Sequence, residues 1–123
     1  MLSAIRTALT SLGYTVHDKR QEKIGTIDAT KEICVVFDDT SVEIETTLTY
    51  HVRTWATLEW NTTTPDNVHS TVVTLVHALE EKLLQGTSPL KATFKFIQSE
   101  VNQLGLMYRV IITVEFVEVI NLG

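Results

Sequence analysis

Residues 42–60 alternate between apolar and polar side chains, and they include neither glycine nor proline. A period of two places successive side chains on opposite sides of an extended chain. Threonine, valine, isoleucine and aromatic residues dominate the run, and these residues favour strands. The pattern therefore predicts one unusually long strand. Its apolar side carries Val42, Ile44, Leu48, Tyr50, Val52, Ala56, Leu58 and Trp60, and its polar side carries Glu43, Glu45, Thr47, Thr49, His51, Arg53, Thr57 and Glu59.

A shorter alternation lies just before this run. Ile33, Val35 and Phe37 fall on one side of residues 31–37, and Asp38-Asp39-Thr40-Ser41 follows with residues that form turns. We therefore expect residues 31–37 and 42–60 to form a hairpin around a turn at 38–41.

Two segments have the spacing of amphipathic helices. In the first, Leu2, Ile5, Leu9 and Leu12 recur every three or four residues before Gly13, which is suited to end a helix. The second is predicted to begin at Thr64-Pro65-Asp66, with Thr64 as its cap, and to end at Gly86. Its apolar stripe comprises Val68, Val72, Leu75, Val76, Leu79 and Leu83.

The remaining segments complete the predicted fold. Residues 14–30 are polar and irregular, with room for a short edge strand at 14–16. Alternation in 92–97 and 108–120 predicts a second hairpin with a polar connection over 98–105. The sequence thus predicts a single α+β domain spanning 1–123, in the order α-β-β-α-β-β. Its antiparallel sheet of about four strands would carry both helices on one face.

Composition narrows the classes of partner. Fifteen acidic and ten basic residues give a net charge of −5, and the basic residues are not pooled, which argues against a grip on nucleic acid. No apolar run is long enough to cross a bilayer, so we expect a soluble protein that does not bind membranes. The single cysteine, Cys34, cannot form an internal disulfide, and its apolar surroundings predict a buried thiol in a reducing compartment.

The residues that most often carry catalysis or bind metals form no recognisable motif. His69 and His77 are eight residues apart, too far for a metal pair on adjacent helical turns, and His17 and His51 lie elsewhere. Carboxylates on an open sheet face, such as Glu43 and Glu45, lack the pocket that acid and base catalysis requires. No phosphate-binding loop or nucleophile elbow is present. We therefore expect no enzyme activity, cofactor or metal.

Trp55 is a large aromatic residue on the otherwise polar side of residues 42–60. An exposed aromatic there would suit a subunit interface. The alternative is a tryptophan that lies over neighbouring threonines or contacts Arg53. The sequence favours neither interpretation.

The order of these elements resembles the tail terminator, or tail completion, proteins of long-tailed bacteriophages. The resemblance covers nearly the whole chain and rests on several features of it. These are the first helix (Leu2, Ile5, Leu9, Leu12), the alternating strand ending in aromatics (Tyr50 to Trp60), the Pro65-Asp66 helix start, the Phe-rich strand (Thr93 to Ile97) and the run Tyr108-Arg109-Val110-Ile111-Ile112-Thr113.

The resemblance implies a structural protein of the virion, assembled in the host cytoplasm and located at the head-tail junction. Six copies would form a ring that caps the tail tube, ends its polymerisation and provides the surface where the head docks. The implied partners are the chain itself, the tail tube protein and a head-completion or neck protein, with DNA passing through the ring without specific binding. We expect the polar side of the long strand to contribute to subunit contacts or to the lumen, through Glu43, Glu45, Arg53, Trp55 and Glu59.

Two alternatives remain open. A neighbouring head-to-tail joining protein would also form a small ring. Small acidic secretion chaperones are similar in size, charge and the order of their first elements, and they act as dimers. They usually end on a helix, whereas residues 119–123 are predicted to end a strand. Oligomeric state separates the dimer from the rings.

Overall fold

The computed structural model describes residues 2–18, 25–85 and 91–123, and side chains throughout these ranges except those of Leu2 and residues 91–100. The described residues form helices, strands and one 3-10 turn. They are α1 (Leu2–Ser11), β1 (Thr15–His17), β2 (Glu32–Thr46), β3 (Thr49–Thr62), the 3-10 turn η1 (Pro65–Asn67), α2 (Val68–Leu84), β4 (Lys91–Leu104) and β5 (Met107–Asn121). The predicted α+β class is confirmed.

The sheet has five strands in the order β1-β2-β3-β5-β4, and it is mixed rather than wholly antiparallel. The fifth strand is β1, which pairs in parallel with residues 32–34 of β2. The intervening segment is long enough for the crossover that a parallel pair requires. Room for an edge strand near residues 14–16 was recognised in the sequence, but the predicted order α-β-β-α-β-β and the four-stranded antiparallel sheet omitted it and are wrong in that respect.

The predicted single strand over 42–60 is also wrong, because the chain reverses within it. Thr46 pairs with Thr49, so Thr47 and Leu48 form a two-residue turn between β2 and β3. The hydroxyl of Thr46 accepts hydrogen bonds from the backbone N–H groups of Leu48 and Thr49, at 3.2 and 3.1 Å. The turn expected at 38–41 is instead an irregularity inside β2, between Phe37 and Asp39.

The second hairpin exists, but its connection is much shorter than predicted. β4 continues to Leu104, which pairs with Met107, so only Gly105 and Leu106 form the turn. Gly105 has a φ of 64°. Residues 101–106 are exposed, so water surrounds this end of the hairpin and polar residues there are compatible with a strand.

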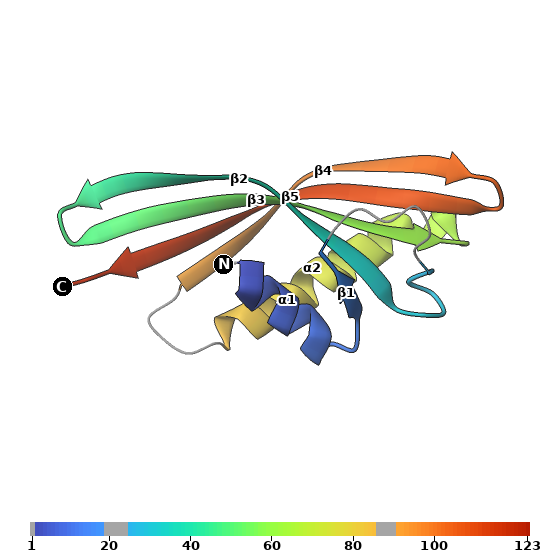
Figure 1. Ribbon diagram of the computed structural model, residues 1–123, viewed down its shortest axis with the longest axis horizontal. Coiled ribbons are helices and arrows are strands. Elements are labelled where there is room, and N and C mark those ends of the chain that lie inside the picture. Colours follow the sequence, from blue (N-terminus) through green and yellow to red (C-terminus); the bar gives the residue numbers. More distant parts are fainter. Residues whose placement is uncertain (1, 19–24, 86–90) are drawn as a thin grey trace.

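The core lies between one face of the sheet and the two helices, as predicted (Figure 1). We call this side of the sheet the core face and the opposite side the outer face. Ile5 and Leu9 of α1 and Leu75 and Leu79 of α2 are buried there. The sheet contributes a continuous row of buried side chains from its two central strands. They are Ala56, Leu58 and Trp60 of β3 and Val110, Ile112, Val114 and Phe116 of β5.

The predicted end of the first helix and the predicted start of the second fall on described residues. Gly13 has a φ of 93° and follows the last turn of α1, as expected. Thr64 does not cap the second helix through its side chain. Pro65 instead opens the 3-10 turn η1, and α2 proper begins at Val68. The predicted helix end at Gly86 lies outside the described residues, although α2 ends at Leu84, close to it.

The sheet is strongly twisted, and its two long hairpins diverge from a crossing point near its middle (Figure 1). The strands that flank β3 and β5 each have a register shift at this level, β2 between Phe37 and Asp39 and β4 between Phe96 and Gln98. Bulges of this kind increase local twist. Beyond the crossing point, the tip of the β2–β3 hairpin extends past the helices (Figure 1). We call this tip, residues 39–54, the arm.

Candidate assembly surface

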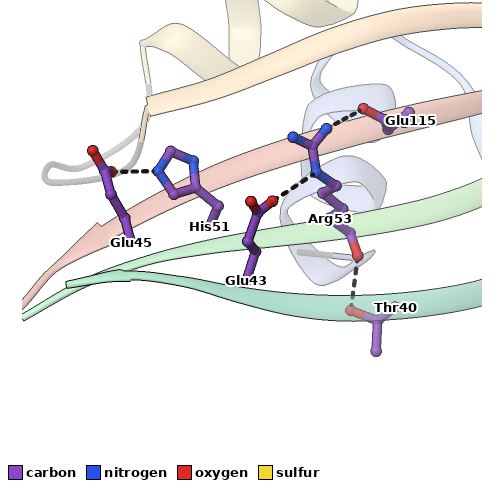
Figure 2. Close-up of polar contacts among 6 residues, drawn as sticks. All are labelled: Thr40, Glu43, Glu45, His51, Arg53 and Glu115. Carbon is purple, nitrogen blue, oxygen red and sulfur yellow. Dashed lines mark hydrogen bonds and ion pairs between the residues drawn. The ribbon is translucent and has the colours of Figure 1, made fainter. Parts of the chain in front are cut away.

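The outer face of the arm carries a group of charged side chains centred on Arg53 (Figure 2). The Arg53 guanidinium lies 2.9 Å from a carboxylate oxygen of Glu115 on β5 and 3.8 Å from one of Glu43 on β2. His51 Nε2 lies 2.6 Å from a carboxylate oxygen of Glu45. Acidic residues outnumber basic ones in this group, so the surface favours a cationic neighbour.

These residues come together because the chain folds back, not because they alternate along one strand. Glu43 of β2 pairs with His51 of β3 in the antiparallel register. Strand pairing then places Arg53 beside Val117 of β5, two residues from Glu115. Three of the predicted site residues, Glu43, Glu45 and Arg53, therefore share one exposed surface. His51 and Glu115 belong to the same group and were not predicted as site residues, since the pairing of the strands was needed to place them.

The core face of the arm is apolar but lies beyond the helices. Val42 and Ile44 are 61% and 68% exposed, and Leu48 at the turn is 51% exposed. Val42 pairs with Val52 and Ile44 with Tyr50, so these side chains continue the row that is buried farther along the sheet. A run of exposed apolar side chains on one strand is typical of a surface that another protein covers.

The other two predicted site residues differ from this group. Trp55 is only partly exposed and lies between Asp39 and Glu115 in the register of the outer face. Glu59 was expected on an outward surface but is 2% exposed. It lies near the middle of the sheet, flanked by Cys34 and Ile111 in the register. Because a central strand is enclosed by its neighbours, alternation alone did not predict this burial.

The described part of the chain has a hollow beside α2. This hollow of about 200 Å³ is lined by Tyr14, Ser70, Thr71, Thr74 and Leu75, none of which is an acid, an imidazole or a thiol. Burial raises the pKa of the Tyr14 phenol, which disfavours its ionised form. Among the described residues, no group of three or more histidines, cysteines and acids is placed to hold a metal ion.

Three of the four histidines lie beside a carboxylate. Besides the His51–Glu45 pair, His77 Nε2 is 3.2 Å from Glu81 one helical turn away, and both side chains are exposed. His17 Nε2 is 3.2 Å from Glu32. The pKa of Glu32 is lowered, mainly because the backbone N–H of Gly25 donates a hydrogen bond to its carboxylate and also because His17 is near, although burial opposes the shift. The His51–Glu45 and His17–Glu32 pairs each link two neighbouring strands, whereas the His77–Glu81 pair lies within α2.

Comparisons with known proteins do not extend these observations. No protein-family model matches the chain, and no curated protein matches it. Of the helices in the described ranges, none combines the length and apolarity needed to span a membrane.

Proposed function

We propose that this chain is a structural subunit that assembles with copies of itself into a ring, as tail terminator proteins of long-tailed phages do. In this role a ring of six caps the tail tube, ends its polymerisation and offers a docking surface to the head. The chain would act in the virion at the head-tail junction, with the tail tube protein and a head-completion or neck protein as its partners.

The observation that carries this proposal is the arm. It extends past the helices with exposed apolar side chains on its core face and a charged group on its outer face (Figure 1). Fully burying a side chain such as Val42 or Ile44 contributes roughly 1.5–3 kcal/mol. Association with another subunit would supply that burial, and a closed ring would give every arm the same environment.

Charge supports the same role. The net charge is −5 per chain, so six chains would form a strongly acidic ring. DNA is a polyanion and gains affinity mainly from cationic side chains. An acidic ring would therefore let DNA pass without holding it.

The first test is the mass of the purified protein over a wide concentration range, measured by native mass spectrometry with negative-stain imaging of the same sample. We expect rings of six, and we expect these rings to stop the growth of tail tubes when added to tube protein. A dimer at every concentration would contradict the proposal and favour a secretion-chaperone role. Rings that bind a neck protein but do not affect tube length would favour a neighbouring joining protein.

Trp55 gives a second test. Changing Trp55 to Glu places a negative charge beside Asp39 and Glu115 in the register of the outer face. If this surface contacts a neighbouring subunit, the variant should assemble poorly while its monomer keeps a native circular dichroism spectrum. Unchanged assembly would remove Trp55 from the interface.

A further inference from the structure

At the end of the sheet that carries the arm, β2 and β4 each have an open edge. β1 pairs with β2 only at residues 32–34, and within the described chain no strand covers the same edge of β2 farther along. β4 is the last strand in the order, and none of the described strands lies on its far edge. Unpaired strand edges present rows of backbone N–H and C=O groups to which another strand can bind.

The directions of the strands determine how two copies would join. β2, β3, β5 and β4 are antiparallel at each step, so β2 and β4 of one chain run in opposite directions. If a second copy in the same orientation continues the sheet, its β4 lies beside β2 of the first copy and runs antiparallel to it. That is a head-to-tail contact, which closes into a ring when the rotation between copies allows it.

The register brings opposite charges together in this arrangement. Across the sheet, Asp39 shares a row with Lys95, and Glu43 shares a row with Lys91. Aligning these rows between copies places Asp39 opposite Lys95 and Glu43 opposite Lys91 of the neighbour. Opposite charges at facing positions stabilise an antiparallel pair, and like charges destabilise it.

A two-fold dimer centred between the same charged residues of either edge would have the reverse effect. Two β2 edges paired around Ser41 place Asp39 of one chain opposite Glu43 of the other. Two β4 edges paired around Thr93 place Lys91 opposite Lys95. Both symmetric arrangements therefore bring like charges together, so the charge pattern favours head-to-tail pairing over two-fold pairing.

From these directions and charges we infer that residues 39–43 of β2 pair antiparallel with residues 91–95 of β4 in a second copy of this chain. The inference rests on the proposed ring but goes further, because it names the strands and the facing residues. In the ring, each subunit uses its β2 edge on one side and its β4 edge on the other.

The test uses two charge-reversal variants and a mixture of them. The β2 variant carries Asp39→Lys and Glu43→Lys, and the β4 variant carries Lys91→Glu and Lys95→Glu. Alone, each variant should raise the concentration needed for half-assembly by about tenfold or more, since its two edges then carry the same charge. Mixed one to one, they should assemble again into rings with equal numbers of each, because every contact joins opposite charges. A chain with all four changes should form rings on its own.

Two controls separate this inference from general effects. Glu80→Lys with Glu81→Lys changes the net charge of the chain by the same amount as the β2 variant, but on α2, and should leave assembly unchanged. Unfolding curves of each variant establish that the monomers are folded. If the wild-type chain forms rings and each variant alone forms them equally well, the edge pairing is overturned but the proposed function is not. Folded variants that stay apart when mixed would overturn the pairing too, and a wild-type chain without rings would overturn both proposals.

Discussion

The carboxylate of Asp28 ties the segment before β2 to the segment after β3. It accepts hydrogen bonds from the Thr62 hydroxyl and the Thr63 backbone N–H, both at 2.8 Å, and from the hydroxyls of Thr63 and Thr64 at 3.2 and 3.5 Å. This explains why Thr64 does not cap the second helix, because its hydroxyl is directed toward Asp28. A carboxylate with several donors is held best when it is ionised.

Asp28 should therefore make stability depend on pH. Burial raises its pKa, but the hydrogen bonds from Thr63, Thr62 and Thr64 outweigh burial, so the pKa lies below its ordinary value. The folded chain then binds this proton less tightly than the unfolded chain does. The contribution to stability is present above the unfolded pKa of about 3.9 and is lost as the pH falls through the folded pKa.

We expect Asp28→Asn to lower the free energy of unfolding at neutral pH by about 1 kcal/mol, a modest value because the side chain is exposed. Urea denaturation at pH 7 and at about pH 3 or below measures the difference from wild type, which should shrink in acid. Asp66→Asn removes the same charge from a nearby exposed residue and should have a smaller effect. An Asp28→Asn loss that is equal at both pH values would contradict the argument.

Arg53 provides a second prediction for a single residue. Glu115 is only 15% exposed and takes its hydrogen bond from Arg53, whereas Glu43 is 69% exposed and lies farther away. Arg53→Met keeps most of the aliphatic stem but leaves Glu115 without this donor, which we expect to cost about 1–2 kcal/mol. Glu43→Gln should cost roughly 0.5 kcal/mol or less. Denaturation of dilute monomer measures the loss of unfolding free energy in each variant. Equal losses would show that the Arg53–Glu115 pair does not stabilise the arm.

At the level of elements, the helices and the core strands could be predicted from the sequence, because each has one face in the core. Ile5 and Leu9 of α1 are buried as their spacing predicts, and so are the alternate β5 residues Val110, Ile112, Val114 and Phe116. The ends of the hairpins could not be predicted in this way, because strands exposed on both faces need no alternation of apolar and polar residues. Thr47-Leu48 contains none of the usual turn residues, and the hydroxyl of Thr46 supports the turn instead.

The candidate surface was predicted in part for the same reason. Alternation placed Glu43, Glu45 and Arg53 together correctly, although the chain reverses between them. It could not reveal the burial of Glu59 or the partners His51 and Glu115, because both depend on which strands lie side by side. Likewise, Asp38-Asp39-Thr40-Ser41 has the composition of a turn but lies where β2 bulges and continues.

The turn between β4 and β5 should be sensitive to its glycine. Gly105 has a φ of 64°, a conformation that L side chains rarely adopt, although no atom lies within 4 Å of where a Cβ would be. Gly105→Ala should therefore destabilise the protein by about 1 kcal/mol through backbone strain alone. Leu106→Ala, at a side chain that is 95% exposed, should have little effect on denaturation. Stabilisation by Gly105→Ala would contradict the strained conformation, since alanine stabilises sites with ordinary φ.

For the whole molecule, the proposed assembly predicts that changes on the exposed apolar side of the arm affect assembly and leave folding intact. Val42→Thr with Ile44→Thr keeps branched side chains suited to a strand and removes apolar surface that this chain alone does not bury. We expect monomer stability to change by roughly 0.5 kcal/mol or less, and the assembly midpoint to rise about tenfold or more. Val73→Thr, at an exposed valine on α2, is the matched control. Loss of stability without loss of assembly would contradict this role for the arm.

The position of β5 has a consequence for the order of events during synthesis. It is translated after the other four strands, yet it lies between β3 and β4 in the sheet. Until β5 emerges from the ribosome, β3 lacks one neighbour and β4 has no strand to pair with. β4, with its open edge, therefore joins the sheet only after β5 has been translated. If copies pair through the β2 and β4 edges as inferred above, a nascent chain without β5 would not yet present both edges within one sheet.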